Sequence, residues 1–113
     1  MKKLTLSAIS LTALIAGCSA TAPKCGDQET IDLVKQILER NISSELGASM
    51  ASTVTYDLTA IRTTRTDDQT GSHRCAAHLD LTASTIGVTR EGPITYTVEL
   101  TDKPGEFYVN ILP

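Results

Sequence analysis

The sequence is poor in aromatic and in basic side chains. It has no tryptophan, and aromatics make up only 4% of its 113 residues. Any core must therefore be mainly aliphatic. The chain carries 10 Lys and Arg against 13 Asp and Glu, a net charge of −3. Because a nucleic-acid partner needs clustered basic residues, we expect no nucleic acid to bind. The length suits a single domain.

Long hydrophobic runs are also missing, and the most apolar segment lies at the N-terminus. The basic start Met1-Lys2-Lys3 precedes apolar and small residues from Leu4 to Ala16. This run is shorter than the ~20 residues that span a bilayer, and the pattern is typical of a secretory signal. The segment closes on Leu14-Ile15-Ala16-Gly17-Cys18.

An aliphatic residue and two small residues before a cysteine resemble the bacterial lipobox. The resemblance implies that residues 1–17 are a signal peptide and that Cys18 is lipidated, because the peptidase site admits only small side chains. The alternative is an ordinary signal with a chance cysteine. In similar lipoproteins of enteric-type bacteria, Asp after the cysteine retains the protein in the inner membrane. Here Ser19 follows, so we expect the periplasmic face of the outer membrane, with the inner membrane as the alternative.

Residues 18–26 resemble a tether, since Ser19 to Lys24 are mostly small, polar or proline. Residues 27–113 then form a single α+β domain outside the cytoplasm. The membrane, reached through Cys18, is the first expected partner.

Two cysteines remain for the exported domain, where disulfides persist. We expect a Cys25–Cys75 bridge. The alternative is a metal site built on Cys75 and His78 with His73 nearby. A zinc site needs three or four ligands, and no second ligand cluster is visible. We therefore expect neither a metal nor a cofactor, and we interpret His78 as a surface imidazole on the solvent side of a strand.

Hydrophobic periodicity predicts one helix and four strands. From Asp27 to Leu46, apolar residues recur at helical spacing, with Asp27 as the expected N-cap and Gly47 as the stop. The apolar positions of this stripe are Ile31, Leu33, Val34, Ile37, Leu38, Ile42 and Leu46. Beyond Gly47 the period becomes two, which is typical of half-buried strands. The inward positions are Val54, Tyr56, Leu58 and Ala60; Cys75, Ala77, Leu79 and Leu81; Ile94, Tyr96, Val98 and Leu100; and Phe107, Val109 and Ile111.

Turn residues separate these strands. We expect a polar loop from Thr66 to Ser72, a connection from Gly87 to Gly92, and a strand that begins at Pro93. Lys103 to Glu106 fits a type II turn, because proline presets its second position and glycine accepts positive φ at its third.

The elements predict a two-layer α+β fold in the order α-β-β-β-β. One N-terminal helix packs on a four-stranded antiparallel β-meander with one disulfide. This outline is similar to cystatin-like folds. A second resemblance rests on a set of segments spread over the chain. They are Cys25, Asp32-Leu33-Val34-Lys35, Ala60-Ile61-Arg62-Thr63-Thr64, Arg74-Cys75-Ala76-Ala77, Pro93–Thr101 and Glu106-Phe107-Tyr108-Val109. With these segments the chain resembles a small uncharacterised domain of exported and membrane-anchored proteobacterial proteins, and the resemblance implies no activity.

No catalytic constellation is apparent, so we do not expect an enzyme. His73 and His78 point to opposite strand faces, and the pair Asp67-Asp68 lies in a turn. The first functional hypothesis is a membrane-anchored interaction or structural module, which binds an unknown protein partner or a second copy along a sheet edge. The alternative is an inhibitor, immunity or exclusion lipoprotein that acts on a periplasmic toxin, lysozyme, phage or plasmid. A loop protruding between Arg62 and Arg74 would favour this alternative.

Overall fold

A computed structural model provides the structure of the chain and describes residues 21–113. Cys18 and the expected signal peptide lie outside these residues. In chain order the elements are α2 (Gln28–Leu46), α3 (Ala48–Ala51), β1 (Val54–Thr66), β2 (His73–Ala83), β3 (Val88–Leu100) and β4 (Phe107–Ile111). The predicted α+β class and element order are confirmed, with the short helix α3 as an unpredicted addition.

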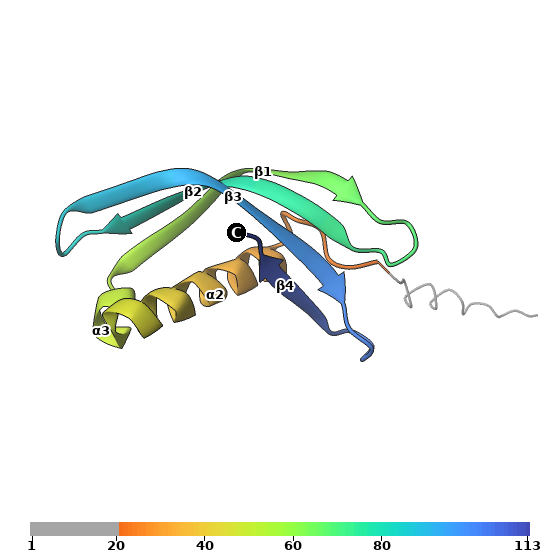
Figure 1. Cartoon of the computed structure of the whole chain (residues 1–113), viewed down its shortest axis with the longest axis horizontal. Coiled ribbons are helices and arrows are strands. Elements are labelled where there is room, and N and C mark those ends of the chain that lie inside the picture. The colour runs from red at the N-terminus through yellow and green to blue at the C-terminus, as the bar shows by residue number, and fades with distance from the viewer. Residues whose placement is uncertain (1–20) are drawn as a thin grey trace, which may run out of the picture.

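The strands form one antiparallel sheet in the order β1-β2-β3-β4, which is the predicted meander. Helix α2 lies along one face of this sheet (Figure 1). Val34, which is fully buried, is the centre of the apolar stripe of the helix. The strand residues buried in the core are Leu58, Cys75, Ala77, Ile94, Tyr96, Val98 and Val109. These strand residues are all among the predicted inward positions, because alternation places every second side chain on the helix-facing side.

Helix α2 ends at the predicted Gly47, but its N-cap and the burial of its last residue differ from the prediction. The side chain of Asp27 caps no helical N–H group; its Oδ2 instead accepts a hydrogen bond of 3.0 Å from the backbone N–H of Lys24. Gly47 ends the helix at a φ of +95°, a conformation that favours glycine. Leu46 was predicted to be in the core but is 65% exposed, because the last turn runs past the buried cluster.

Strand β3 begins at Val88, five residues before the predicted start, so the prediction that Gly87–Gly92 is a connection is wrong. Gly92 and Pro93 lie inside the strand, opposite Leu79 and His78. Strand β4 pairs only with Tyr96–Leu100. At Pro93, β3 therefore has a single neighbouring strand, and a residue without an N–H group is tolerated there.

Strand β1 is longer than predicted and contains a bulge. Ala60 has a φ of +51°, and the pairing with β2 shifts register between Thr59 and Arg62. The extra residue reverses which side chains face inward. Ala60, predicted to be inward, is exposed, and Ile61 packs against the core instead.

The predicted disulfide is confirmed: Cys25 and Cys75 are bonded, and both are almost fully buried. The bond joins the segment before α2 to the second strand. Residues 21–26, the described part of the expected tether, pack on the domain. Ala22 is only 4% exposed, and its N–H donates to the carbonyl of Gly71 at 3.0 Å. The packed domain therefore begins at Ala22 rather than at residue 27.

Three tyrosines are expected to make the domain less stable at alkaline pH. Burial raises the pKa of Tyr96 above its ordinary value of 10.0, and the hydrogen bond from Tyr108 to Glu99 raises that of Tyr108. The pKa of Tyr56 is raised by burial and then by the charge of Glu39.

A folded-state pKa above the unfolded value means that the folded chain holds these protons more tightly. We therefore expect the contribution of these tyrosines to the free energy of unfolding to be fully present below about pH 10 and to be lost as the pH rises through their folded-state pKa values. Urea unfolding at a series of pH values checks this. A free energy that rises above pH 10 would contradict it.

Candidate functional site

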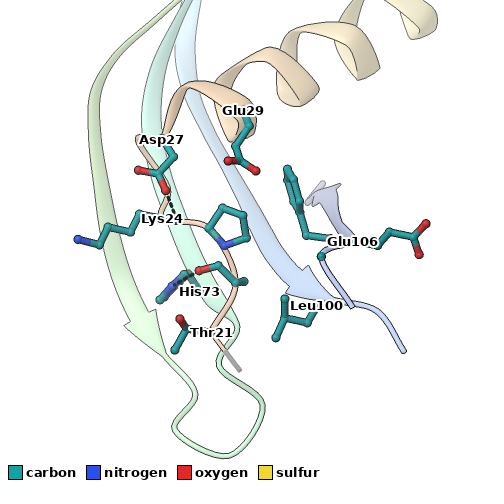
Figure 2. Close-up of a pocket in the computed structure, with 11 residues that line it drawn as sticks. Thr21, Lys24, Asp27, Glu29, His73, Leu100 and Glu106 are labelled. Carbon is teal, nitrogen blue, oxygen red and sulfur yellow. Dashed lines mark hydrogen bonds between the residues drawn. The ribbon is translucent and has the colours of Figure 1, made fainter. Parts of the chain in front are cut away.

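A hollow on the described surface lies where four chain segments meet. Its volume is about 520 Å³, and it is open to solvent on one side. The N-terminal segment, the first turn of α2, the start of β2 and the β3–β4 hairpin each contribute to its wall, as Figure 2 shows. Its lining residues are Thr21, Ala22, Pro23, Lys24, Asp27, Glu29, His73, Leu100, Gly105, Glu106 and Phe107.

Backbone hydrogen bonds hold the N-terminal wall of the hollow. Lys24 and Asp27 form a reciprocal pair, in which the N–H of Lys24 donates to Asp27 Oδ2 and the N–H of Asp27 donates to the Lys24 carbonyl at 3.2 Å. Next to this turn, the disulfide fixes Cys25 to β2. The phenol of Tyr96 donates to the Cys25 carbonyl at 3.0 Å. This wall is therefore part of the rigid fold rather than of a loose tether.

The hairpin wall is set by a tight turn. Gly105 has a φ of +77°, and the N–H of Glu106 donates to the carbonyl of Lys103 at 3.1 Å, as predicted for a turn from Lys103 to Glu106. The turn places Phe107 and Leu100, which are paired across β3 and β4, beside the hollow. These two side chains contribute apolar surface to the wall of the hollow.

His73 lines the hollow, and both nitrogens of its imidazole form hydrogen bonds with the protein. Its Nε2 lies 3.3 Å from the carbonyl oxygen of Ala22, and its Nδ1 lies 3.0 Å from Thr66 Oγ1. A carbonyl oxygen can only accept, so Nε2 donates to the Ala22 carbonyl, and Nδ1 forms a hydrogen bond with the Thr66 hydroxyl. Both ring nitrogens are hydrogen-bonded to the protein, so His73 acts as a structural link between the N-terminal segment and the sheet.

The rim of the hollow is acidic. Its lining includes one lysine, Lys24, and three acidic residues, Asp27, Glu29 and Glu106. In Figure 2 the carboxylate of Glu29 reaches toward the hollow from the start of α2, and that of Glu106 points away from it. A carboxylate such as that of Glu29, next to the apolar side chains of Leu100 and Phe107, favours a ligand that carries an amine or guanidinium beside an apolar group.

A second group of side chains lies on the opposite face of the sheet. His78 and Asp80 stand two residues apart on β2, and Glu91 lies directly opposite Asp80 on β3. His78 Nε2 is 3.3 Å from Asp80 Oδ1 and 3.7 Å from Glu91 Oε1. The expected solvent-side placement of His78 agrees with its half-exposed side chain. The alternation of β2 predicts Asp80 on the same face as His78, but sequence analysis missed Glu91, because Glu91 was assigned to a connection.

The structure also shows where Cys75, the segment from Arg62 to Arg74 and Asp67 lie. The sulfur of Cys75 is bonded to Cys25, so the alternative of a metal site that includes Cys75 is excluded. The segment from Arg62 to Arg74, which would have favoured an inhibitor had it protruded as a loop, is mostly strand, and residues 67–72 connect β1 to β2 close to the predicted polar loop. Asp67 lies in this turn, where its Oδ1 accepts the N–H groups of Gln69 and Thr70.

Among residues 21–113, the helices are too short or too polar to cross a membrane.

Compared with known protein families, with curated proteins and with solved structures, the chain shows no match. The resemblances to lipoprotein leaders and to a small exported domain therefore stay predictions.

Proposed function

We propose that this chain is an exported lipoprotein, anchored by Cys18, whose domain binds a protein partner close to the membrane. The observation that carries the proposal is the buried Cys25–Cys75 disulfide. Structural disulfides form and persist in oxidising compartments such as the periplasm. With these two thiols bonded to each other, Cys18 is the single cysteine left for another role.

The packing of the N-terminal segment supports a short leash. Ala22 is buried on the domain, four residues after Cys18. An extended chain covers about 3.3–3.6 Å per residue, so the leash spans about 14 Å at most. A lipid on Cys18 would hold the domain against the membrane by the end that carries the hollow. In Figure 1 the same end holds the β1–β2 connection and the β3–β4 turn.

The hollow provides a place for a partner of definite chemistry. Phe107 and Leu100 offer apolar surface, and Glu29 offers a carboxylate at the start of a helix. A protein segment with a basic side chain next to an apolar one matches this combination. The volume of about 520 Å³ suits one or two side chains rather than a folded domain. We therefore assign the hollow to such a segment of an envelope protein, with the outer membrane as the proposed location.

The anchor is tested by replacing Cys18. In cells fed a labelled fatty acid, we expect the C18S variant to take up no label and to leave the membrane fraction. The matched control is Ser19→Ala, which should keep both. Equal labelling of the wild-type chain and the C18S variant would refute the anchor.

The hollow is tested by photo-crosslinking in intact cells. We expect a photoreactive residue at Lys24, on the rim of the hollow, to form one dominant covalent complex with another envelope protein. The same residue at Ile86, which is 59% exposed at the opposite end of the domain, serves as the control. Charge reversal of Glu29 to Lys should reduce the Lys24 complex at least several-fold. Identical products from both positions would contradict a binding role for the hollow.

A further inference from the structure

A row of acidic side chains crosses three strands on the sheet face away from α2. Asp57 on β1 pairs with Asp80 on β2, and Asp80 pairs with Glu91 on β3. Directly opposite residues of neighbouring antiparallel strands lie on one face with their Cβ atoms about 4.5–5.5 Å apart, and like charges at such positions destabilise a sheet. This row needs a compensating positive charge.

Lysine and arginine do not supply that charge. Among residues 21–113, the contacts closer than 4.0 Å between a carboxylate and a basic side chain are the two that His78 makes with Asp80 and Glu91. The basic side chains of the neighbouring positions lie elsewhere: Arg90 is on the opposite face of β3, paired with Leu81, and Arg62 donates to the carbonyl of Ala60. The acidic row therefore faces a single imidazole.

The three side chains converge on one point. His78 Nε2, a carboxylate oxygen of Asp80 and one of Glu91 all lie within 4.8 Å of one another, and the two distances from the imidazole are 3.3 and 3.7 Å. Bonds of about 2.0–2.2 Å at tetrahedral angles place the ligand atoms of a zinc ion about 3.4 Å apart. The observed spacing is thus close to that of three ligands around one ion, before any ion pulls them together.

The strands hold this arrangement without help from loops. His78 and Asp80 share a face of β2 because they are two residues apart, and Glu91 is fixed by the continuous register from His73↔Val98 to Ala83↔Val88. The imidazole and the Asp80 carboxylate are 39% and 35% exposed, so both are partly shielded, and Glu91 is more open at 67%. The geometry leaves the solvent side free for water ligands.

We infer that His78, Asp80 and Glu91 form a binding site for a divalent transition-metal ion of the zinc type, completed by solvent. One imidazole nitrogen and two carboxylate oxygens are ligands that zinc accepts. Calcium requires six to eight oxygen ligands, and magnesium needs near-ideal octahedral oxygen geometry, so this set favours neither. The ion supplies the positive charge that the row lacks, and Asp57 contributes charge rather than a bond. The site is independent of the proposed anchor and of the hollow.

The test is titration of Zn²⁺ into the full chain carrying C18S, so that no free thiol competes, against a chromophoric chelator. We expect one ion per chain, with the affinity lowered at least about tenfold in H78A, D80N and E91Q. The control H73Q removes the other imidazole, and D57N removes an adjacent charge; both should keep the stoichiometry of one. Far-UV circular dichroism should be the same for all variants, because the substituted groups lie on the surface.

A second readout separates coordination from simple charge attraction. In NMR spectra, Zn²⁺ should shift the imidazole resonances of His78 and leave those of His73 in place, whereas Mg²⁺ at the same concentration should shift neither. No competition with the chelator, or the same affinity in the wild-type chain and H78A, would overturn the site.

Discussion

Replacing both Cys25 and Cys75 with Ala lowers the free energy of unfolding by about 4 kcal/mol in this account. The two cysteines are 50 residues apart in the sequence. Closing a loop of that length in the unfolded chain costs conformational entropy, which corresponds to about 4 kcal/mol in the loop-entropy treatment. Small domains have total stabilities of only about 5–15 kcal/mol, so a large part of the stability is lost. Urea unfolding of the oxidised chain and of the double variant measures the difference.

Reduction provides the matched control for the double variant. The wild-type chain treated with dithiothreitol should unfold at nearly the same urea concentration as the C25A/C75A variant. Hydrogen exchange should also rise at Ala22 and Lys24, because the bond pins this segment to β2. A loss of less than about 1 kcal/mol would contradict the structural role assigned to the bond.

Replacing Tyr96 with Ala costs about 3–5 kcal/mol, the range for removing a large buried side chain. Tyr96 is fully buried, and it is the largest side chain that is so completely enclosed in the described domain. Its ring lies in the aliphatic core between sheet and helix, and its hydroxyl satisfies the carbonyl of Cys25. The substitution therefore removes packing and a hydrogen bond together.

Phenylalanine at position 96 separates the two contributions. The Y96F variant keeps the ring but leaves the Cys25 carbonyl without its donor, which costs about 1–3 kcal/mol for a buried group. It also lacks the phenol whose pKa is raised by burial, so its stability should fall less steeply above pH 10. Tyr108→Phe, at an exposed position, is the comparison and should change stability little. Equal losses for Y96F and Y96A would mean that the ring contributes no packing energy.

Local patterns in the sequence predicted most of the fold. The helix from Gln28 to Leu46 depends on spacing within one segment, and the inward positions of β2 and β4 depend on alternation within one strand. Both are properties of neighbouring residues. The Cys25–Cys75 bond was predictable too. The sequence has three cysteines, and if Cys18 carries a lipid, only Cys25 and Cys75 are available to form a disulfide.

The errors occurred where distant segments decide the structure. Pro93 reads as the start of a strand, but the absence of β4 beside that part of β3 lets the strand continue through it. For the same reason, the sequence did not place Glu91 opposite Asp80. Ala22 reads as part of a linker because it is small, but hydrogen bonds to Gly71 and His73 hold it on the domain. Neither partner is close to it in sequence.

The mass of the protein purified from its native membrane decides whether Cys18 is the lipidated first residue of an exported chain. We expect a chain that starts at Cys18, carries added acyl groups, and shows two thiols that react with an alkylating reagent only after reduction. A chain that still begins with an unmodified Met1 and has free Cys25 and Cys75 would contradict the export, the anchor and the proposed place of action together.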